Sequence, residues 1–105
     1  MKSEEKRALD ELKRILQERY GVTSVVVYGS KARGDDSPDS DIDVMIVLDD
    51  YTPQIEAAVD ELLYDINLAH DCLISLVIFG RRELEEGPLA ESPLYKRILV
   101  EGVPL

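Results

Sequence analysis

Apolar residues recur at helical spacing in three parts of the chain and predict three amphipathic helices. The first helix spans residues 3–19, with an apolar face formed by Ala8, Leu9, Leu12, Ile15 and Leu16. The second begins at Thr52-Pro53, a capping residue followed by proline, and runs to about Leu68. The third begins in the same way at Ser92-Pro93 and ends at Gly102, and a shorter helix is expected over residues 82–86.

Continuous runs of β-branched and other apolar residues predict three buried strands, over residues 23–28, 41–48 and 72–79. The loop 29–40 is expected to hold one helical turn around Ser30 to Arg33. Because a helix joins the second and third strands, we expect these two strands to be parallel and adjacent. The order predicts an α/β (α+β) fold, with a small three-stranded mixed sheet flanked by helices.

Length and composition add further expectations. A chain of 105 residues is expected to form one domain, residues 1–105, that is stable without disulfides. The one cysteine, Cys72, excludes an internal disulfide and fits a reducing cytoplasm. The longest apolar run is shorter than the ~20 residues of a membrane span, and no signal-peptide core follows the N-terminus. We therefore expect a cytoplasmic protein that does not enter a membrane.

The formal net charge is −10, from 22 acidic and 12 basic residues. A surface this acidic repels the phosphate backbone of nucleic acids, so we expect no non-specific binding of DNA or RNA. A basic protein partner, or a substrate accompanied by cations, fits this charge better.

Two carboxylates one residue apart, Asp41 and Asp43, lead into the second predicted strand. The alternation of a strand places both on one face, where each is partly desolvated beside a like charge. A bound Mg²⁺ would neutralise both, which makes the pair a candidate metal site. A lone Asp-x-Asp pattern is more often a loop end followed by a solvated strand residue, and that alternative stays open at this point.

A second candidate site lies at the end of the first strand. Gly29 permits a sharp turn and a close approach of the backbone, and Ser30 adds a hydroxyl group. The free amides of a helical turn at this point would bind phosphate oxygens, and Arg33 would add a charge-assisted contact. The alternative is that Gly29 and Gly34 only shape a surface loop.

The two patterns together are far more specific than either alone. They read Gly29-Ser30-Lys31-Ala32-Arg33-Gly34 and then Ser40-Asp41-Ile42-Asp43-Val44. In this order the residues resemble the minimal nucleotidyltransferases of the DNA polymerase β-like superfamily. The length of the chain and the order of its elements extend this resemblance over most of the sequence.

The resemblance implies the polymerase β-like nucleotidyltransferase fold and the transfer of a nucleoside monophosphate, AMP from ATP, to a hydroxyl group. It also implies that Gly29 and Ser30 contact the triphosphate and that Arg33 assists electrostatically. Asp41 and Asp43 would be the catalytic residues and would hold two Mg²⁺ ions.

The resemblance further implies a partner protein. Stand-alone members of the family often pair with a helical HEPN-type toxin, act as its antitoxin and can transfer AMP to one of its tyrosines. An acidic surface suits a basic partner of this kind. A small acceptor such as an aminoglycoside is less favoured, because members that modify such molecules usually carry a further acceptor-binding domain.

The sequence departs from the family pattern at one position. The family generally has a third carboxylate on the following strand, and the corresponding position here is held by Ser75. Asp71 lies four residues earlier and would fill the role only if the register of the strands shifted. Three alternatives remain: Asp71 supplies the carboxylate, another group does, or activity is weak or lost. In the last case the protein would be a module that regulates a partner by binding.

Overall fold

The computed structural model describes residues 1–35, 37 and 39–105. The helices are α1 (Ser3–Tyr20), α2 (Gly29–Arg33), α3 (Pro53–His70), α4 (Arg81–Glu86) and α5 (Pro93–Glu101), with a 3₁₀ turn, η1 (Pro88–Glu91), before α5. The strands are β1 (Ser24–Tyr28), β2 (Ile42–Leu48), β3 (Ile74–Gly80) and β4 (Val103–Pro104). The predicted α/β class and the short helix at Gly29–Arg33 are confirmed.

The strands form a mixed sheet in the order β3-β2-β1-β4. β1 is antiparallel to β2 and β4, and β2 and β3 are parallel neighbours, as predicted. The predicted number of three strands is wrong, because β4 adds a strand next to β1. This strand has only two residues, too few to produce a recognisable pattern. The backbone N–H of Leu105 extends the pairing by donating to the carbonyl of Val25 at 2.9 Å.

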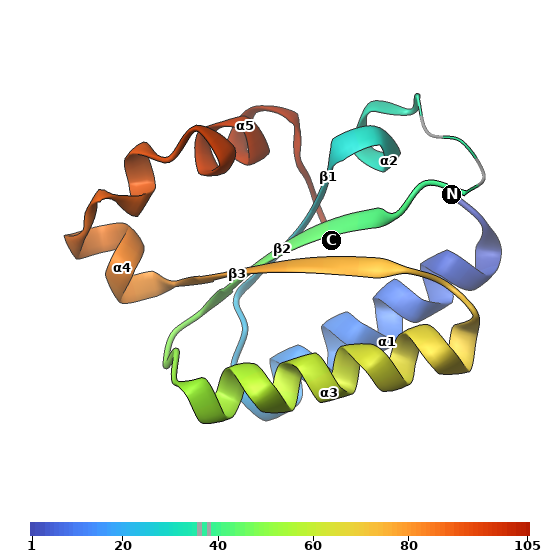
Figure 1. Ribbon diagram of the computed structural model, residues 1–105, viewed down its shortest axis with the longest axis horizontal. Helices are drawn as coiled ribbons and strands as arrows, with labels where there is room; N and C mark the ends of the chain where they lie inside the picture. The colour runs from blue at the N-terminus through green and yellow to red at the C-terminus, as the bar shows by residue number, and fades with distance from the viewer. Residues whose placement is uncertain (36, 38) are drawn as a thin grey trace.

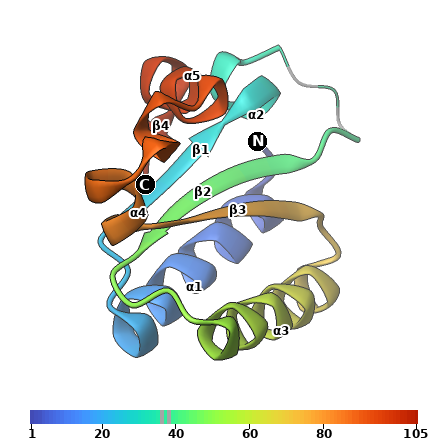
Figure 2. The same ribbon diagram turned by 60° about the vertical axis from the view of Figure 1, so that its left-hand side comes forward.

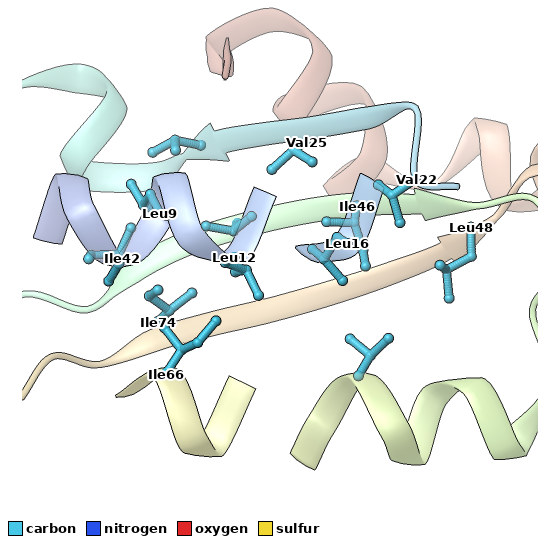
Figure 3. Close-up of a cluster of buried hydrophobic side chains, with 14 residues drawn as sticks. Leu9, Leu12, Leu16, Val22, Val25, Ile42, Ile46, Leu48, Ile66 and Ile74 are labelled. Carbon is cyan, nitrogen blue, oxygen red and sulfur yellow. The ribbon is translucent and has the colours of Figure 1, made fainter. Parts of the chain in front are cut away.

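The elements form layers on both faces of the sheet. α1 and α3 lie side by side on one face, while α2, α4 and α5 lie on the other side (Figures 1 and 2). Apolar side chains from α1, α3 and the first three strands meet between the helices and the sheet (Figure 3). Burying each of these side chains contributes about 1.5–3 kcal/mol. A smaller cluster on the opposite face contains Met45, Val47, Phe79 and Ile98.

The predicted caps at Thr52 and Ser92 are confirmed, and the first helix starts at the predicted residue. Thr52 Oγ1 accepts a hydrogen bond from the Ile55 N–H at 3.1 Å, and Ser92 Oγ accepts one from the Tyr95 N–H at 3.4 Å. Ser3 does not cap α1 but is its first helical residue. In the described parts of the chain, no helix has the length and apolar character needed to cross a membrane.

Candidate functional site

The centre of the candidate site is a row of three side chains across the sheet. Asp43 of β2 pairs in register with Tyr28 of β1 on one side and with Ser75 of β3 on the other. The neighbouring residues Ile42 and Val44 are buried against α1 and α3, so the row faces the opposite side of the sheet. Adjacent strands lie about 4.8 Å apart, which brings a phenol and a hydroxymethyl group next to the Asp43 carboxylate.

The turn that begins α2 lies directly against Asp43. Gly29 has a positive φ of 72°, and a Cβ atom built on it would overlap with a carboxylate oxygen of Asp43. Glycine is therefore required twice here, for its backbone conformation and for the absence of a side chain. The structure thus brings Gly29 and Asp43 into contact, although they lie 14 residues apart in the sequence.

The surroundings of the Asp43 carboxylate disfavour its negative charge. Partial burial raises the pKa of Asp43, the charge of Asp41 raises it further, and Arg33 acts in the opposite direction. Burial and the charge of Asp43 also raise the pKa of the Tyr28 hydroxyl. A cation bound between the two carboxylates would remove the repulsion that raises the pKa of Asp43.

Arg33 and the Gly29 amide both contact a carboxylate that the sequence did not point to. Glu101, the last residue of α5, accepts a hydrogen bond from the Gly29 N–H at 3.3 Å. Its two carboxylate oxygens lie 3.4 Å from Nη1 of Arg33. Asp35 binds the same guanidinium group through Nε at 3.2 Å, and Asp35 first and then Glu101 raise the pKa of Arg33. The only feature of the sequence that marks Glu101 is its position directly before Gly102, where the last predicted helix ends.

A buried ion pair connects α2 to α1. Lys31 Nζ lies 3.4 Å from Glu5 Oε2 of α1, and the two side chains are 1% and 8% exposed. The other Glu5 oxygen accepts a hydrogen bond from the Lys2 N–H at 2.9 Å. The sequence did not single out Glu5, and Lys31 stood out only as part of the Gly29–Gly34 motif. The pair fixes α2, and with it the Gly29 turn, to the start of α1.

The structure settles where Ser75 and Asp71 lie. Ser75 is the residue of β3 that pairs with Asp43, so the strand register does not shift. Asp71 does not lie on this strand, because β3 begins at Ile74 rather than at the predicted residue 72. Asp71 instead ends α3 in a left-handed conformation, with φ 49° and its N–H bonded to the carbonyl of Asn67. Among the described residues, no group of three His, Cys, Asp or Glu side chains is placed to hold a metal ion.

Two carboxylates nevertheless fit a magnesium ion that arrives with a nucleotide. Mg²⁺ is commonly bound by one or two carboxylates and completes its octahedral shell with water and substrate phosphates. Asp41 and Asp43 supply such a donor pair. Because Gly29 has no side chain, only its backbone lies beside the Asp43 carboxylate. The residues present therefore suit the ion together with a phosphate ligand.

The chain is similar to known proteins. The model of a family described as a nucleotidyltransferase domain matches residues 9–104. A protein of Methanocaldococcus jannaschii, provisionally named protein adenylyltransferase MJ1379, is 44% identical over 48 residues, which are 46% of this chain and 48% of that protein. The chain spans about half the length of the curated relatives it matches.

Solved structures support the fold. One provisionally assigned as a minimal nucleotidyltransferase is 26% identical with a TM-score of 0.65, covering 100% of this chain and 97% of that one. A toxin-antitoxin structure with AMP-PNP also has a TM-score of 0.65, at 19% identity, covering 98% of this chain and 72% of that one. Because the family model matches nearly the whole sequence, the chain belongs to the nucleotidyltransferase domain family.

Proposed function

We propose that the protein is a Mg²⁺-dependent nucleotidyltransferase that transfers AMP from ATP to a hydroxyl group of a partner protein. The observation that carries this proposal is the contact between the Gly29 turn and Asp43, with Asp41 one residue away. A backbone suited to phosphate thus lies against an acidic pair suited to a metal. Membership of the family and the provisional name of a relative, protein adenylyltransferase, support the reaction class.

The residues of the site fall into two groups with different roles in this reaction. The amides and hydroxyl of Gly29 and Ser30 bind oxygens of the triphosphate, and Arg33 offsets its charge. Asp41 and Asp43 would hold Mg²⁺, and the ion would supply positive charge against the phosphates and the leaving pyrophosphate. The acceptor hydroxyl attacks the α-phosphorus, so one O–P bond forms as the bond to the β-phosphate oxygen breaks.

The position on β3 that pairs with Asp43 supplies no carboxylate base for the acceptor proton. Ser75 holds the paired position on β3, and its hydroxyl cannot accept a proton as a carboxylate does. We therefore infer that the proton passes to water or to a group that the acceptor brings.

The partner that fits best is a basic, helical toxin of the HEPN type, for which the protein acts as the antitoxin in the cytoplasm. One structural neighbour comes from a toxin-antitoxin structure with AMP-PNP, and another from the toxin-antitoxin MntA-HpeT. The net charge of −10 favours association with a basic surface.

Calorimetric titration with AMP-PNP tests the site without any partner. The wild type should bind the analogue in the presence of Mg²⁺, and Asp41→Asn and Asp43→Asn should each weaken this binding by at least about tenfold. Asp60→Asn, which removes an exposed acid of α3, is the matched control and should bind like the wild type. Equal Mg²⁺-dependent affinity in all four proteins would remove the basis of the proposal.

A second candidate function is regulation of the partner by contact alone, which Ser75 at the paired position of β3 favours. Transfer from α-labelled ATP to a co-purified partner distinguishes the two. Label that reaches the partner and disappears in Asp43→Asn supports the enzyme. Full neutralisation of the toxin by Asp41→Asn and Asp43→Asn, without any label, supports the binding module.

A further inference from the structure

The carboxylate of Glu101 lies on the two donors that the proposed function assigns to the triphosphate. It accepts from the Gly29 N–H at 3.3 Å, and both of its oxygens lie 3.4 Å from Arg33 Nη1. An amide and a guanidinium that converge on one carboxylate form an anion-binding arrangement. Glu101, a residue of the chain itself, therefore occupies the position where an anion would bind.

The backbone around Glu101 is fixed by close packing, which makes this contact a built feature. The next residue, Gly102, touches β1 and α5 so closely that a Cβ atom would overlap with a Val26 methyl group and the Ile98 carbonyl. The Gly102 N–H also donates to that carbonyl at 2.8 Å. The Glu101 side chain itself is only 20% exposed. The end of α5 therefore delivers the carboxylate to a defined place.

Two anions cannot use the same donors. A triphosphate that binds the Gly29 amide and Arg33 lies close to the negative charge of Glu101. The repulsion between the two anions weakens the binding of each to these donors. Arg33 cannot offset both charges, because its Nε is already bound by Asp35 at 3.2 Å.

We propose that Glu101 determines the affinity of the site for nucleotide by competing with it. Its carboxylate stands in for a phosphate group on the Gly29 N–H and Arg33, and a triphosphate has to displace it. This inference rests on the proposed function, because it assumes that these donors bind phosphate. It predicts that the negative charge of Glu101 lowers the affinity for ATP, so that removing the charge raises it.

Glu101→Gln is the variant that tests the competition. Glutamine keeps the size of the side chain and an oxygen that accepts from the Gly29 N–H, but it lacks the charge. The matched control is Glu91→Gln, which removes one negative charge from a solvent-exposed pair with Lys96 in the same part of the chain. Both variants have the same net charge, so a general change in the electrostatic field affects them equally.

The affinity for inorganic tripolyphosphate and for Mg²⁺ with AMP-PNP is measured by calorimetry. Glu101→Gln should lower the dissociation constant for both probes by about fivefold relative to the wild type, the change expected for one partly exposed ion pair. Glu91→Gln should leave both constants unchanged. If Glu101 only holds Arg33 and the turn in place, its replacement weakens binding instead, and that result overturns the inference while the proposed function stands.

Failure of the proposed function has a different signature. If neither the wild type nor any variant binds either probe, both proposals fall together. If Glu101→Gln binds a probe that the wild type does not, the competition is supported in its strongest form.

NMR of the wild type keeps the inference testable if the variant does not fold. Addition of tripolyphosphate should shift the Gly29 amide and the side-chain carboxyl of Glu101 together, because the contact between them is broken. A shift of the Gly29 amide with an unchanged Glu101 carboxyl would show that nucleotide and Glu101 bind side by side, and would overturn the competition.

Discussion

At the residue scale, the site depends on a glycine that has no substitute. Gly29 combines a left-handed backbone with direct contact to the Asp43 carboxylate. Gly34, five residues later, has a similar φ of 79°, but among the described residues other than its two chain neighbours no atom lies within 4 Å of the place where a Cβ would be. The two glycines therefore separate the effect of backbone conformation from the effect of contact with the site.

Replacement of each glycine by alanine should reveal this difference. Both variants should lose about 1 kcal/mol of stability from the left-handed conformation. Gly29→Ala should in addition displace Asp43 and lose Mg²⁺-dependent binding of AMP-PNP, while Gly34→Ala should keep it. Thermal melting gives the stability, and calorimetry gives the binding. Equal affinities in the two variants would mean that the contact with Asp43 has no role in binding.

The sequence could indicate which residues of the candidate site lie close together where these residues are near one another in the chain. Asp43 follows Gly29 by one turn and one short loop, so a turn and two strands suffice to bring them together. Glu101 could not be predicted, because its place depends on how α5 packs on β1, 72 residues from Gly29. Lys31 lay within the motif, but its buried partner Glu5 lies on another helix.

At the scale of elements, a histidine joins the two long helices. His70, the last residue of α3, places Nδ1 2.7 Å from a Glu4 oxygen and Nε2 2.6 Å from a Glu11 oxygen, both on α1. Ionised carboxylates only accept hydrogen bonds, so both contacts are hydrogen bonds when each ring nitrogen carries a proton and the imidazole is charged. The hydrogen bond to Glu11 first, and then that to Glu4, raises the pKa of His70.

This bridge should make stability depend on pH. Because the folded pKa of His70 lies above its ordinary value of 6.5, the stabilisation is complete below that value and is lost as the pH rises through the folded pKa. His70→Gln should therefore lower the melting temperature at about pH 6 and have little effect at about pH 9.

A control variant makes this test specific. Arg14→Gln breaks the exposed pair with Glu18 on α1, and its effect should be small and similar at both pH values. If His70→Gln shifts the melting temperature by the same amount at both pH values, the charged bridge does not contribute.

The elements that were predicted well carry strong local signals. The amphipathic pattern and the caps at Thr52 and Ser92 allow α3 and α5 to be predicted without knowledge of the tertiary structure. The β4 strand was missed because its two residues become a strand only through pairing with β1. The start of β3 was placed two residues early, because Asp71 takes a left-handed conformation that ends α3 and delays the strand.

At the scale of the whole molecule, the charge limits the possible partners. With 22 acidic and 12 basic residues, the average field repels polyanions at long range. A nucleotide accompanied by Mg²⁺ brings much of its own compensating charge, whereas a nucleic-acid backbone does not. The acidic surface is thus compatible with the proposed substrate and unfavourable for nucleic acids.

Fluorescence anisotropy with labelled duplex DNA and single-stranded RNA tests this limit. We expect no saturable binding at about 0.15 M salt, where only strong or close charge interactions persist. A basic DNA-binding protein serves as the positive control. Saturable binding that weakens steeply with added salt would reveal a basic surface large enough to overcome the net charge.

The two flanks of the sheet differ, and under the proposed function this difference bears on how an acceptor would reach Asp43. β4 closes the flank beyond β1, whereas in the described chain β3 has a neighbouring strand only on its β2 side. Asp43 lies one strand inward from that open flank, and the exposed Ser75 is the last side chain of its row. Under the proposed function, an acceptor on the surface of a macromolecule would reach Asp43 from the β3 flank, past Ser75. The shape of that macromolecule would then help to decide whether its hydroxyl group is modified.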